Sequence, residues 1–129
     1  MTPDLTYLAL TAALCSVLWI PYIVGLIKTF GAEASDYREL PQREQPAWLR
    51  RAYRAHLNMV ENLPVFAALV LVAHVAGEAS TLTATAAMVF FWARVAHAVV
   101  FFGGWPYVRT LAFAVAWLAN IVILWEILA

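Results

Sequence analysis

The sequence predicts an all-α integral membrane protein, folded as a bundle of four transmembrane helices. Hydrophobic residues make up 64% of the 129-residue chain and charged residues only 12%, and such a composition is too apolar for a soluble domain of this length. A helix that crosses a bilayer needs about 20 apolar residues, and the chain holds four stretches of this kind. The predicted spans cover residues 5–27, 57–76, 82–102 and 107–128 of a single domain.

The first span contains no charged residue, and no basic residue precedes it. Its length exceeds the roughly 7 to 15 apolar residues of a secretory signal, so we expect it to remain in the mature protein as a helix. Pro21 in this span and Pro64 in the second each remove a backbone hydrogen bond and tend to kink a helix, which neighbouring helices in a bundle can tolerate. Between the last two spans, residues 103–106 (GGWP) predict a tight turn, because glycine ends helices and proline suits the first turn of the next.

The basic residues predict the orientation of the chain in the membrane. Most of them lie in or beside the only long polar loop, at about residues 29–50: Lys28, Arg38, Arg43, Arg50, Arg51 and Arg54. The loop around residues 77–81 contains no lysine or arginine. By the positive-inside rule we expect the long loop to be cytosolic, and an even number of spans then places both termini outside.

Two predicted spans carry ionisable groups at membrane depth, where an unpaired charge costs several kcal/mol and marks a candidate functional site. Arg54, Asn58 and Glu61 follow the i, i+4, i+7 spacing of one helix face, and Arg94, His97 and Phe101 form a second stripe. With about 1.5 Å of rise per residue, Glu61 and Arg94 lie about 10 to 13 Å from the cytosolic ends of their helices. We therefore expect the two stripes to share one site open to the cytosol.

These residue types suit a small anionic or zwitterionic ligand with several carboxylates, such as glutathione. Arginine can form paired hydrogen bonds to a carboxylate, Glu61 can accept from an ammonium group, and Asn58 can donate and accept. Arg109 opens the fourth helix, where a guanidinium and a helix N-terminus together can lower a thiol pKa from about 8.5 toward or below neutrality. Thr110 can add a hydroxyl hydrogen bond, and Lys28 ends the first helix on the same side.

Both stripes resemble the MAPEG family, the membrane-associated proteins in eicosanoid and glutathione metabolism. In the second span the resemblance rests on the run Arg54-Ala55-His56 followed by Asn58, Glu61, Pro64 and Phe66. In the third it rests on Arg94-Val95-Ala96-His97 and on the spacing from there to Arg109. Together with the four-span layout, these motifs cover most of the chain.

The resemblance implies a homotrimer of four-helix subunits that binds glutathione between neighbouring subunits at the cytosolic side. It implies that Arg109 stabilises the thiolate, that Thr110 replaces a serine beside it, and that Lys28 replaces a basic residue at the end of the first helix. The remaining glutathione ligands that we expect are Arg54, Asn58, Glu61, Arg94 and His97.

The chain also departs from the family pattern at several positions. Leu57 and Met59 stand where eicosanoid-forming members have polar residues, and Phe101 and Phe113 stand where they commonly have tyrosines. We therefore expect a general glutathione transferase or peroxidase that acts on hydrophobic electrophiles or lipid hydroperoxides. The compact size resembles bacterial members, which implies the inner membrane. The expected partners are glutathione, the hydrophobic substrate, membrane lipids and two further copies of the chain, and not nucleic acid.

Other interpretations of the same residues remain open. Arg94 and Glu61 can form a buried ion pair that only fixes the helix register, and His97 can be a neutral imidazole hydrogen-bonded to another helix. A small oligomeric carrier of lipophilic cations would use Glu61 as its membrane carboxylate, although the surrounding cations oppose this. A catalytically inactive scaffold of the same fold is a further alternative.

The three histidines do not predict a metal site. His56, His74 and His97 lack ligand spacing and the chain has one cysteine, so we expect no bound metal. His56 falls on the helix face opposite Arg54 and Asn58, where we expect a structural or lipid-interface role.

Overall fold

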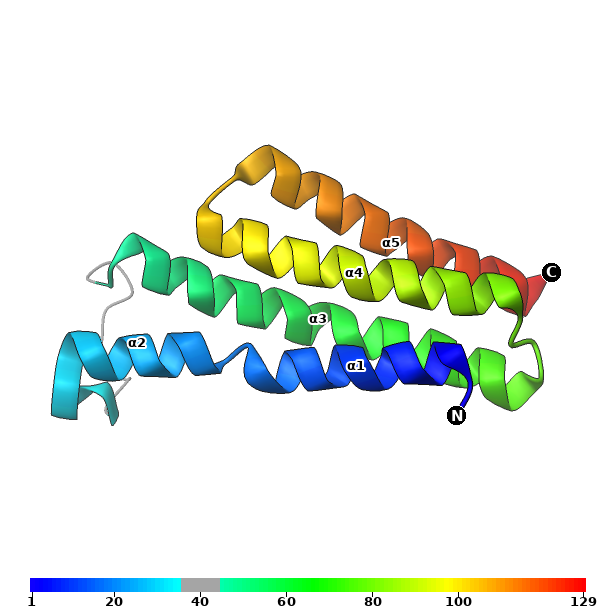
Figure 1. The fold of residues 1–129 in the computed structure, drawn as a ribbon, viewed down its shortest axis with the longest axis horizontal. Helices are drawn as coiled ribbons and strands as arrows, with labels where there is room; N and C mark the ends of the chain where they lie inside the picture. The colour runs from blue at the N-terminus through cyan, green and yellow to red at the C-terminus, as the bar shows by residue number, and fades with distance from the viewer. Residues whose placement is uncertain (36–44) are drawn as a thin grey trace.

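The computed structural model describes residues 1–35 and 45–129, and the regular elements in these ranges are all helices (Figure 1). They are α1 (Pro3–Val17), α2 (Ile20–Phe30), the 3-10 helix η1 (Gly31–Ser35), α3 (Ala47–Ala76), α4 (Thr81–Gly103) and α5 (Pro106–Leu128). Four helical segments are long and apolar enough to cross a membrane: Pro3–Ala34, Ala47–Ala76, Thr81–Gly103 and Pro106–Leu128.

The first predicted span, residues 5–27, is two helices placed end to end (Figure 1). α1 ends at Val17, and α2 begins at Ile20 with Pro21 in its first turn. A proline has no N–H to donate to the carbonyl four residues earlier, and its ring collides with that carbonyl. That carbonyl belongs to Val17, so the break falls where Pro21 requires it. Pro64, in contrast, lies inside α3 without ending it.

Helix α3 begins at Ala47, ten residues before the predicted second span, so the loop expected at 29–50 is shorter than predicted. Arg38 and Arg43 in that loop lie outside the described residues. The added turns of α3 pack against α2. Gly25 of α2 lies so close to Leu49 that any larger residue there would bring its Cβ within 2.6 Å of Leu49 Cδ1. The ring centroids of Tyr22 and Tyr53 are 4.7 Å apart. The sequence missed this extension because its polar, arginine-rich residues lack the composition of a membrane span.

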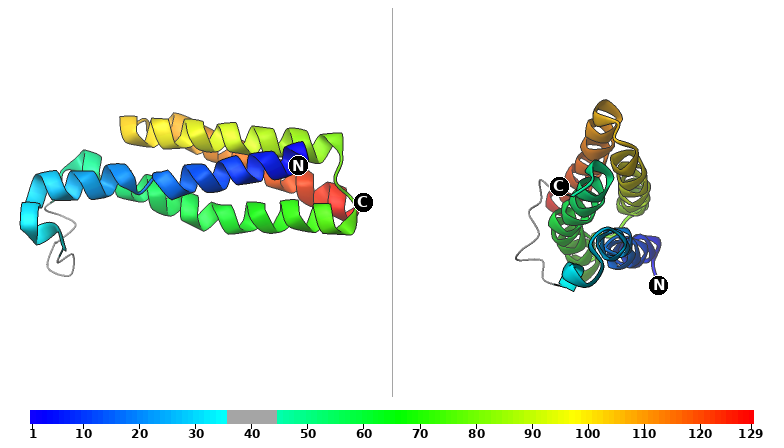
Figure 2. Two further views of the ribbon diagram at one scale, coloured as in Figure 1. Left: turned by 60° about the horizontal axis from the view of Figure 1, so that its bottom comes forward. Right: turned by 90° about the vertical axis from the view of Figure 1, so that its left-hand side faces the viewer.

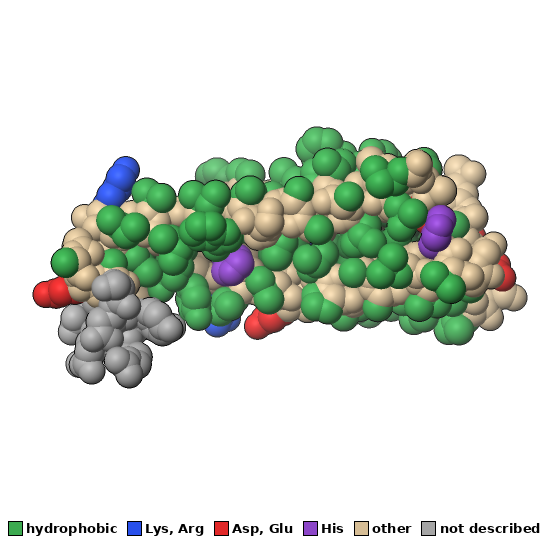
Figure 3. Space-filling model, turned by 90° about the horizontal axis from the view of Figure 1, so that it is seen from below, with side chains coloured by type: hydrophobic (Ala, Val, Ile, Leu, Met, Phe, Trp, Pro, Cys, Tyr) green, Lys and Arg blue, Asp and Glu red, His purple; other side chains and the backbone are tan. Residues whose placement is uncertain are grey.

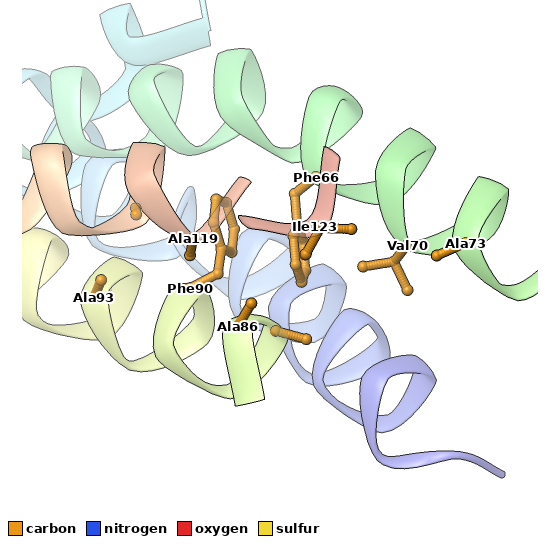
Figure 4. Close-up of a cluster of buried hydrophobic side chains, with 10 residues drawn as sticks. Phe66, Val70, Ala73, Ala86, Phe90, Ala93, Ala119 and Ile123 are labelled. Carbon is orange, nitrogen blue, oxygen red and sulfur yellow. The ribbon is translucent and has the colours of Figure 1, made fainter. Parts of the chain in front are cut away.

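The bundle is held together mainly by α4, which packs against α5, α1 and α3. Both termini lie at the end of the bundle that holds the α3–α4 turn, opposite α2 and η1 (Figures 1 and 2). A core of buried apolar side chains joins α3, α4 and α5 (Figure 4). At its centre the rings of Phe66 and Phe90 stack with centroids 3.9 Å apart.

Most of the outer surface is hydrophobic, as Figure 3 shows for one face along the length of the bundle. Large apolar side chains that point outward include Val75, Trp92, Val99, Leu111 and Trp125. Exposure of such a surface to water would be unfavourable, whereas lipid or a second subunit would keep it out of water.

The turn between α4 and α5 fixes where α5 starts. Gly104 ends α4 in the left-handed conformation at φ 79°, and Pro106 is the first residue of α5, as the GGWP segment predicts. Arg51 of α3 braces the turn, because its Nε donates to the Phe102 carbonyl at 3.2 Å. Arg109 is thereby placed in the first turn of α5, beside the last turns of α4.

Candidate functional site

A cleft of about 400 Å³ lies between α3, α4 and α5, near the end of the bundle that holds the α4–α5 turn. Its volume falls in the range of roughly 300 to 1,000 Å³ that is usual for small-molecule sites. The lining residues are Arg54 and Asn58 from α3, His97 and Phe101 from α4, and Arg109, Thr110 and Phe113 from α5. The structure thus brings together predicted site residues from three helices that are distant in sequence.

The cleft is positively charged. Arg54 is exposed and Arg109 half-buried, and the described residues that line the cleft include no aspartate or glutamate. The Arg109 guanidinium lies over the ring of Phe101, with its central carbon 4.9 Å from the ring centroid. Its side chain forms no hydrogen bond or ion pair with other described residues, so its N–H groups are free for an anionic ligand.

Arg94 lies behind the cleft. Its side chain is 1% exposed, and its Nη2 donates to Asn58 Oδ1 at 2.6 Å. Its Nε and Nη1 have no hydrogen-bond partner within the described ranges. The bond orients the Asn58 amide so that its oxygen points toward Arg94. In this single chain Arg94 therefore acts on the cleft through Asn58.

The alternative ion pair between Arg94 and Glu61 is wrong for this chain. Within residues 1–35 and 45–129, neither side chain forms an ion pair. Asn58 occupies the position facing Arg94, whereas Glu61, about one turn further along α3, is exposed. Glu61 instead lines a second cavity of about 40 Å³, which it shares with Arg54, Leu57, Asn58 and Phe101.

His97 lines the main cleft from α4 and is 2% exposed. Its ring lies 5.4 Å from that of Phe101, and its Nδ1 has no hydrogen-bond partner in the described part of the chain. The alternative in which this imidazole is tied to another helix has no hydrogen bond to support it among those residues. His97 therefore contributes its ring to the wall of the cleft, while its Nδ1 is buried.

The two remaining predicted residues differ in position. Thr110 lines the cleft, but its hydroxyl donates to the Pro106 carbonyl at 3.1 Å, so its single proton is already used within α5. Lys28 is exposed in the last turn of α2 and lines neither of the two cavities. A single chain does not bring Lys28 to the other site residues.

Phe101 and Phe113 complete the cleft; the sequence placed Phe101 on the stripe of Arg94 and His97, whereas Phe113 was noted only as a departure from the family pattern. A signal for them is present in the sequence: Phe101 extends the stripe of Arg94 and His97, and Phe113 stands four residues after Arg109 on the same helix face. Among the described residues, no three histidine, cysteine, aspartate or glutamate side chains lie close enough to hold a metal ion.

Comparison with known proteins supports the resemblance noted in the sequence. The sequence model of the MAPEG family matches residues 5–129, which is nearly the whole chain. No individual curated protein matches at a significant level. The family includes glutathione transferases and related glutathione-dependent members, and some of its members are inactive. A match of this extent, on a chain with four helices able to cross a membrane, identifies the protein as an integral membrane member of the MAPEG family.

Proposed function

We propose that the protein is a membrane-bound glutathione transferase and peroxidase that acts on hydrophobic electrophiles or lipid hydroperoxides. The observation that carries this proposal is the cleft, in which Arg54, Asn58, His97 and Arg109 converge without a carboxylate among the described lining residues. Such a lining attracts an anion with several hydrogen-bonding groups. Glutathione has two carboxylates, an ammonium group and a thiol.

The two cavities together match the charges of glutathione. Arg54 and Arg109 can bind carboxylate or thiolate, and Asn58, oriented by Arg94, offers its amide N–H groups. Glu61 stands in the adjacent cavity, where it can receive the ammonium group. His97 supplies a further polar contact from α4.

Arg109 is the residue to which we assign thiol activation. It combines a free guanidinium with the N-terminal turn of α5, and both favour a thiolate over a thiol. The proton that leaves the sulfur passes to bulk water at the open side of the cleft. Thr110, whose proton is engaged, contributes less in this arrangement.

Two reactions follow from a bound thiolate. In transfer, the sulfur attacks an electrophilic carbon, a C–S bond forms, and the leaving group departs with its electron pair. In reduction, the thiolate attacks the terminal oxygen of a lipid hydroperoxide, the O–O bond breaks, and the alkoxide leaves and takes a proton from water to become the alcohol. A second glutathione then converts the sulfenic acid to the disulfide and water. Both substrates can enter from the lipid phase along the apolar outer surface of the helices (Figure 3).

The assembly that we propose is a homotrimer in a bacterial inner membrane, with the cleft facing the cytosol and both termini outside. The termini lie at the opposite end of the bundle from the α4–α5 turn (Figure 1), near which the cleft residues lie, and this is compatible with the orientation. Because Lys28 is outside the cleft of its own chain, we propose that it reaches the cleft of a neighbouring subunit.

The test is turnover by the purified protein in lipid vesicles, with an activated aryl chloride and a lipid hydroperoxide as substrates. We expect rates that saturate with glutathione, and a fall in kcat of about 100-fold in Arg109→Ala, the usual effect of removing one donor that stabilises a developing anion. Arg109→Lys should keep part of the rate, and Arg50→Ala, which removes an exposed arginine outside both cavities, should not change it.

Two results would reject the proposal. Glutathione binding without turnover of either substrate would indicate an inactive scaffold. Absence of glutathione binding would leave the carrier of lipophilic cations as the alternative. Its membrane carboxylate would be Glu61, which shares a cavity with Arg54, and the nearby positive charge disfavours a cationic substrate.

A further inference from the structure

One aromatic side chain connects the two helices that form the cleft. The ring of Phe101, in the last turns of α4, has the Arg109 guanidinium of α5 over its face at 4.9 Å. The His97 ring lies 5.4 Å away, tilted by 55°. Phe101 lines both cavities and is half-buried. The ring is therefore held from its own helix while it supports a charge on the next one.

A contact of this kind differs from the other ways of holding an arginine. A cation within about 6 Å of a ring centroid is attracted by the negative face of the ring. A carboxylate would also hold Arg109, but it would neutralise the charge and occupy the N–H groups that a ligand needs. Phe101 occupies none of them. Within the described residues, the Arg109 side chain forms no hydrogen bond or ion pair beside this ring contact.

We infer that Phe101 is a positioning residue that holds the Arg109 guanidinium in the cleft with its charge and N–H donors free. An arginine held in place loses less side-chain freedom when it meets its anion, so more of the interaction appears as stabilisation of that anion. The effect on the thiolate rests on the proposed function, whereas the contact itself does not.

The contact can be tested without glutathione, through the rate at which phenylglyoxal modifies Arg109, followed by mass spectrometry of peptides. Phe101→Leu and Phe101→Met remove the ring, and we expect each to raise the Arg109 rate about two- to fivefold, the factor that corresponds to a partly exposed cation–π contact. Phe101→Tyr keeps the ring face and should keep the wild-type rate. Arg50, exposed and outside the cleft, serves as the reference in the same digest.

The functional consequence is tested by the thiolate absorbance of each variant at saturating glutathione. Phe101→Leu and Phe101→Met should lower the thiolate fraction about two- to fivefold with little change in the Kd for glutathione. Phe101→Tyr should keep the wild-type thiolate fraction. Size-exclusion profiles in detergent and helical circular dichroism identify any variant that does not fold, and the two aliphatic variants serve as alternatives to each other.

The outcomes separate the two proposals. An Arg109 rate that is unchanged in both aliphatic variants, or raised equally in Phe101→Tyr, would overturn the contact. Faster modification of Arg109 by phenylglyoxal in the aliphatic variants, with an unchanged thiolate fraction, would overturn the positioning role. Absence of thiolate in the wild-type protein would overturn the proposed function, and the phenylglyoxal rates would still decide whether Phe101 holds Arg109.

Discussion

At the scale of single residues, the contact between Arg94 and Asn58 organises the site. Helical spacing predicts that Arg54, Asn58 and Glu61 share one face, and the structure places all three at the two cavities. Spacing alone does not select which of them faces Arg94, because Asn58 and Glu61 are only about 60° apart around α3 and about 4.5 Å apart along it. The choice depends on the packing of α3 against α4.

We predict that removing either partner of this contact destabilises the protein. Asn58→Leu leaves a buried guanidinium without its acceptor and should lower the free energy of unfolding by about 1.5 to 3 kcal/mol, the usual contribution of a hydrogen bond to a charged group. Arg94→Met should also destabilise, and the double variant should lose less than the sum of the two single losses. Denaturant unfolding in detergent measures the cycle, and strictly additive losses would contradict the contact.

Thr110 gives a second prediction at this scale. Its hydroxyl proton is donated to the Pro106 carbonyl, so it is not free to stabilise a thiolate. Thr110→Val, which keeps the shape of the side chain, should therefore lower the thiolate fraction of bound glutathione far less than Arg109→Ala. Thiolate absorbance of the two variants at saturating glutathione measures this, and equal losses would show that the Thr110 hydroxyl turns toward the ligand.

At the scale of helices, the sequence predicts where the chain crosses the membrane better than where its helices end. Pro21 predicts a kink in the first span, and the structure has a local interruption there, where α1 ends at Val17 and α2 begins at Ile20 although Leu18 and Trp19 keep helical torsions. The start of α3 was not predicted, because its arginine-rich composition is typical of a loop. The packing of Leu49 against α2, which accompanies this part of the helix, is not visible in the sequence. Apolar length identifies a span, whereas helix ends depend on caps and on packing with other elements.

The opposite end of the bundle offers a prediction about how helices are joined. The Ser80 hydroxyl at the N-cap of α4 donates to Glu126 Oε2 in the last turn of α5 at 2.8 Å. Glu126→Ala should lower the free energy of unfolding by about 1 to 2 kcal/mol, as expected for a partly buried, charge-assisted hydrogen bond. Glu126→Gln keeps an acceptor oxygen and should recover much of the loss.

The matched control is Glu78→Ala, which removes an exposed glutamate from the neighbouring α3–α4 turn. Thermal unfolding in one detergent compares the three variants. A loss in Glu78→Ala equal to that in Glu126→Ala would show that surface charge, and not the hydrogen bond, is responsible.

At the scale of the whole molecule, composition predicted four spans, and the resemblance of the motifs in two of them predicted the MAPEG family; the four candidate spans and the family match confirm both. Contacts that depend on side-chain conformation were beyond the sequence. Two examples are the cation–π contact between Arg109 and Phe101 and the hydrogen bond from the Thr110 hydroxyl to the Pro106 carbonyl. Each depends on a side-chain torsion, which residue spacing does not determine.

We predict that the assembled protein is a trimer in which subunits share their sites. Native mass spectrometry from detergent should give about three times the 14.3 kDa mass of the chain. Lys28→Ala should weaken glutathione binding, and trimers that combine Lys28→Ala with Arg109→Ala subunits should recover part of the thiolate signal, because some sites then hold both native residues. Monomers that bind glutathione with full affinity would contradict a shared site.

The central claim is that Arg109 in this cleft converts bound glutathione to its thiolate, and the most direct test is the ultraviolet thiolate absorbance of the purified protein titrated with glutathione at neutral pH. We expect a saturable absorbance in the wild-type protein that is absent from Arg109→Ala, while calorimetry shows that the variant still binds glutathione with similar affinity. Equal absorbance in the two proteins at saturation would contradict the role assigned to Arg109.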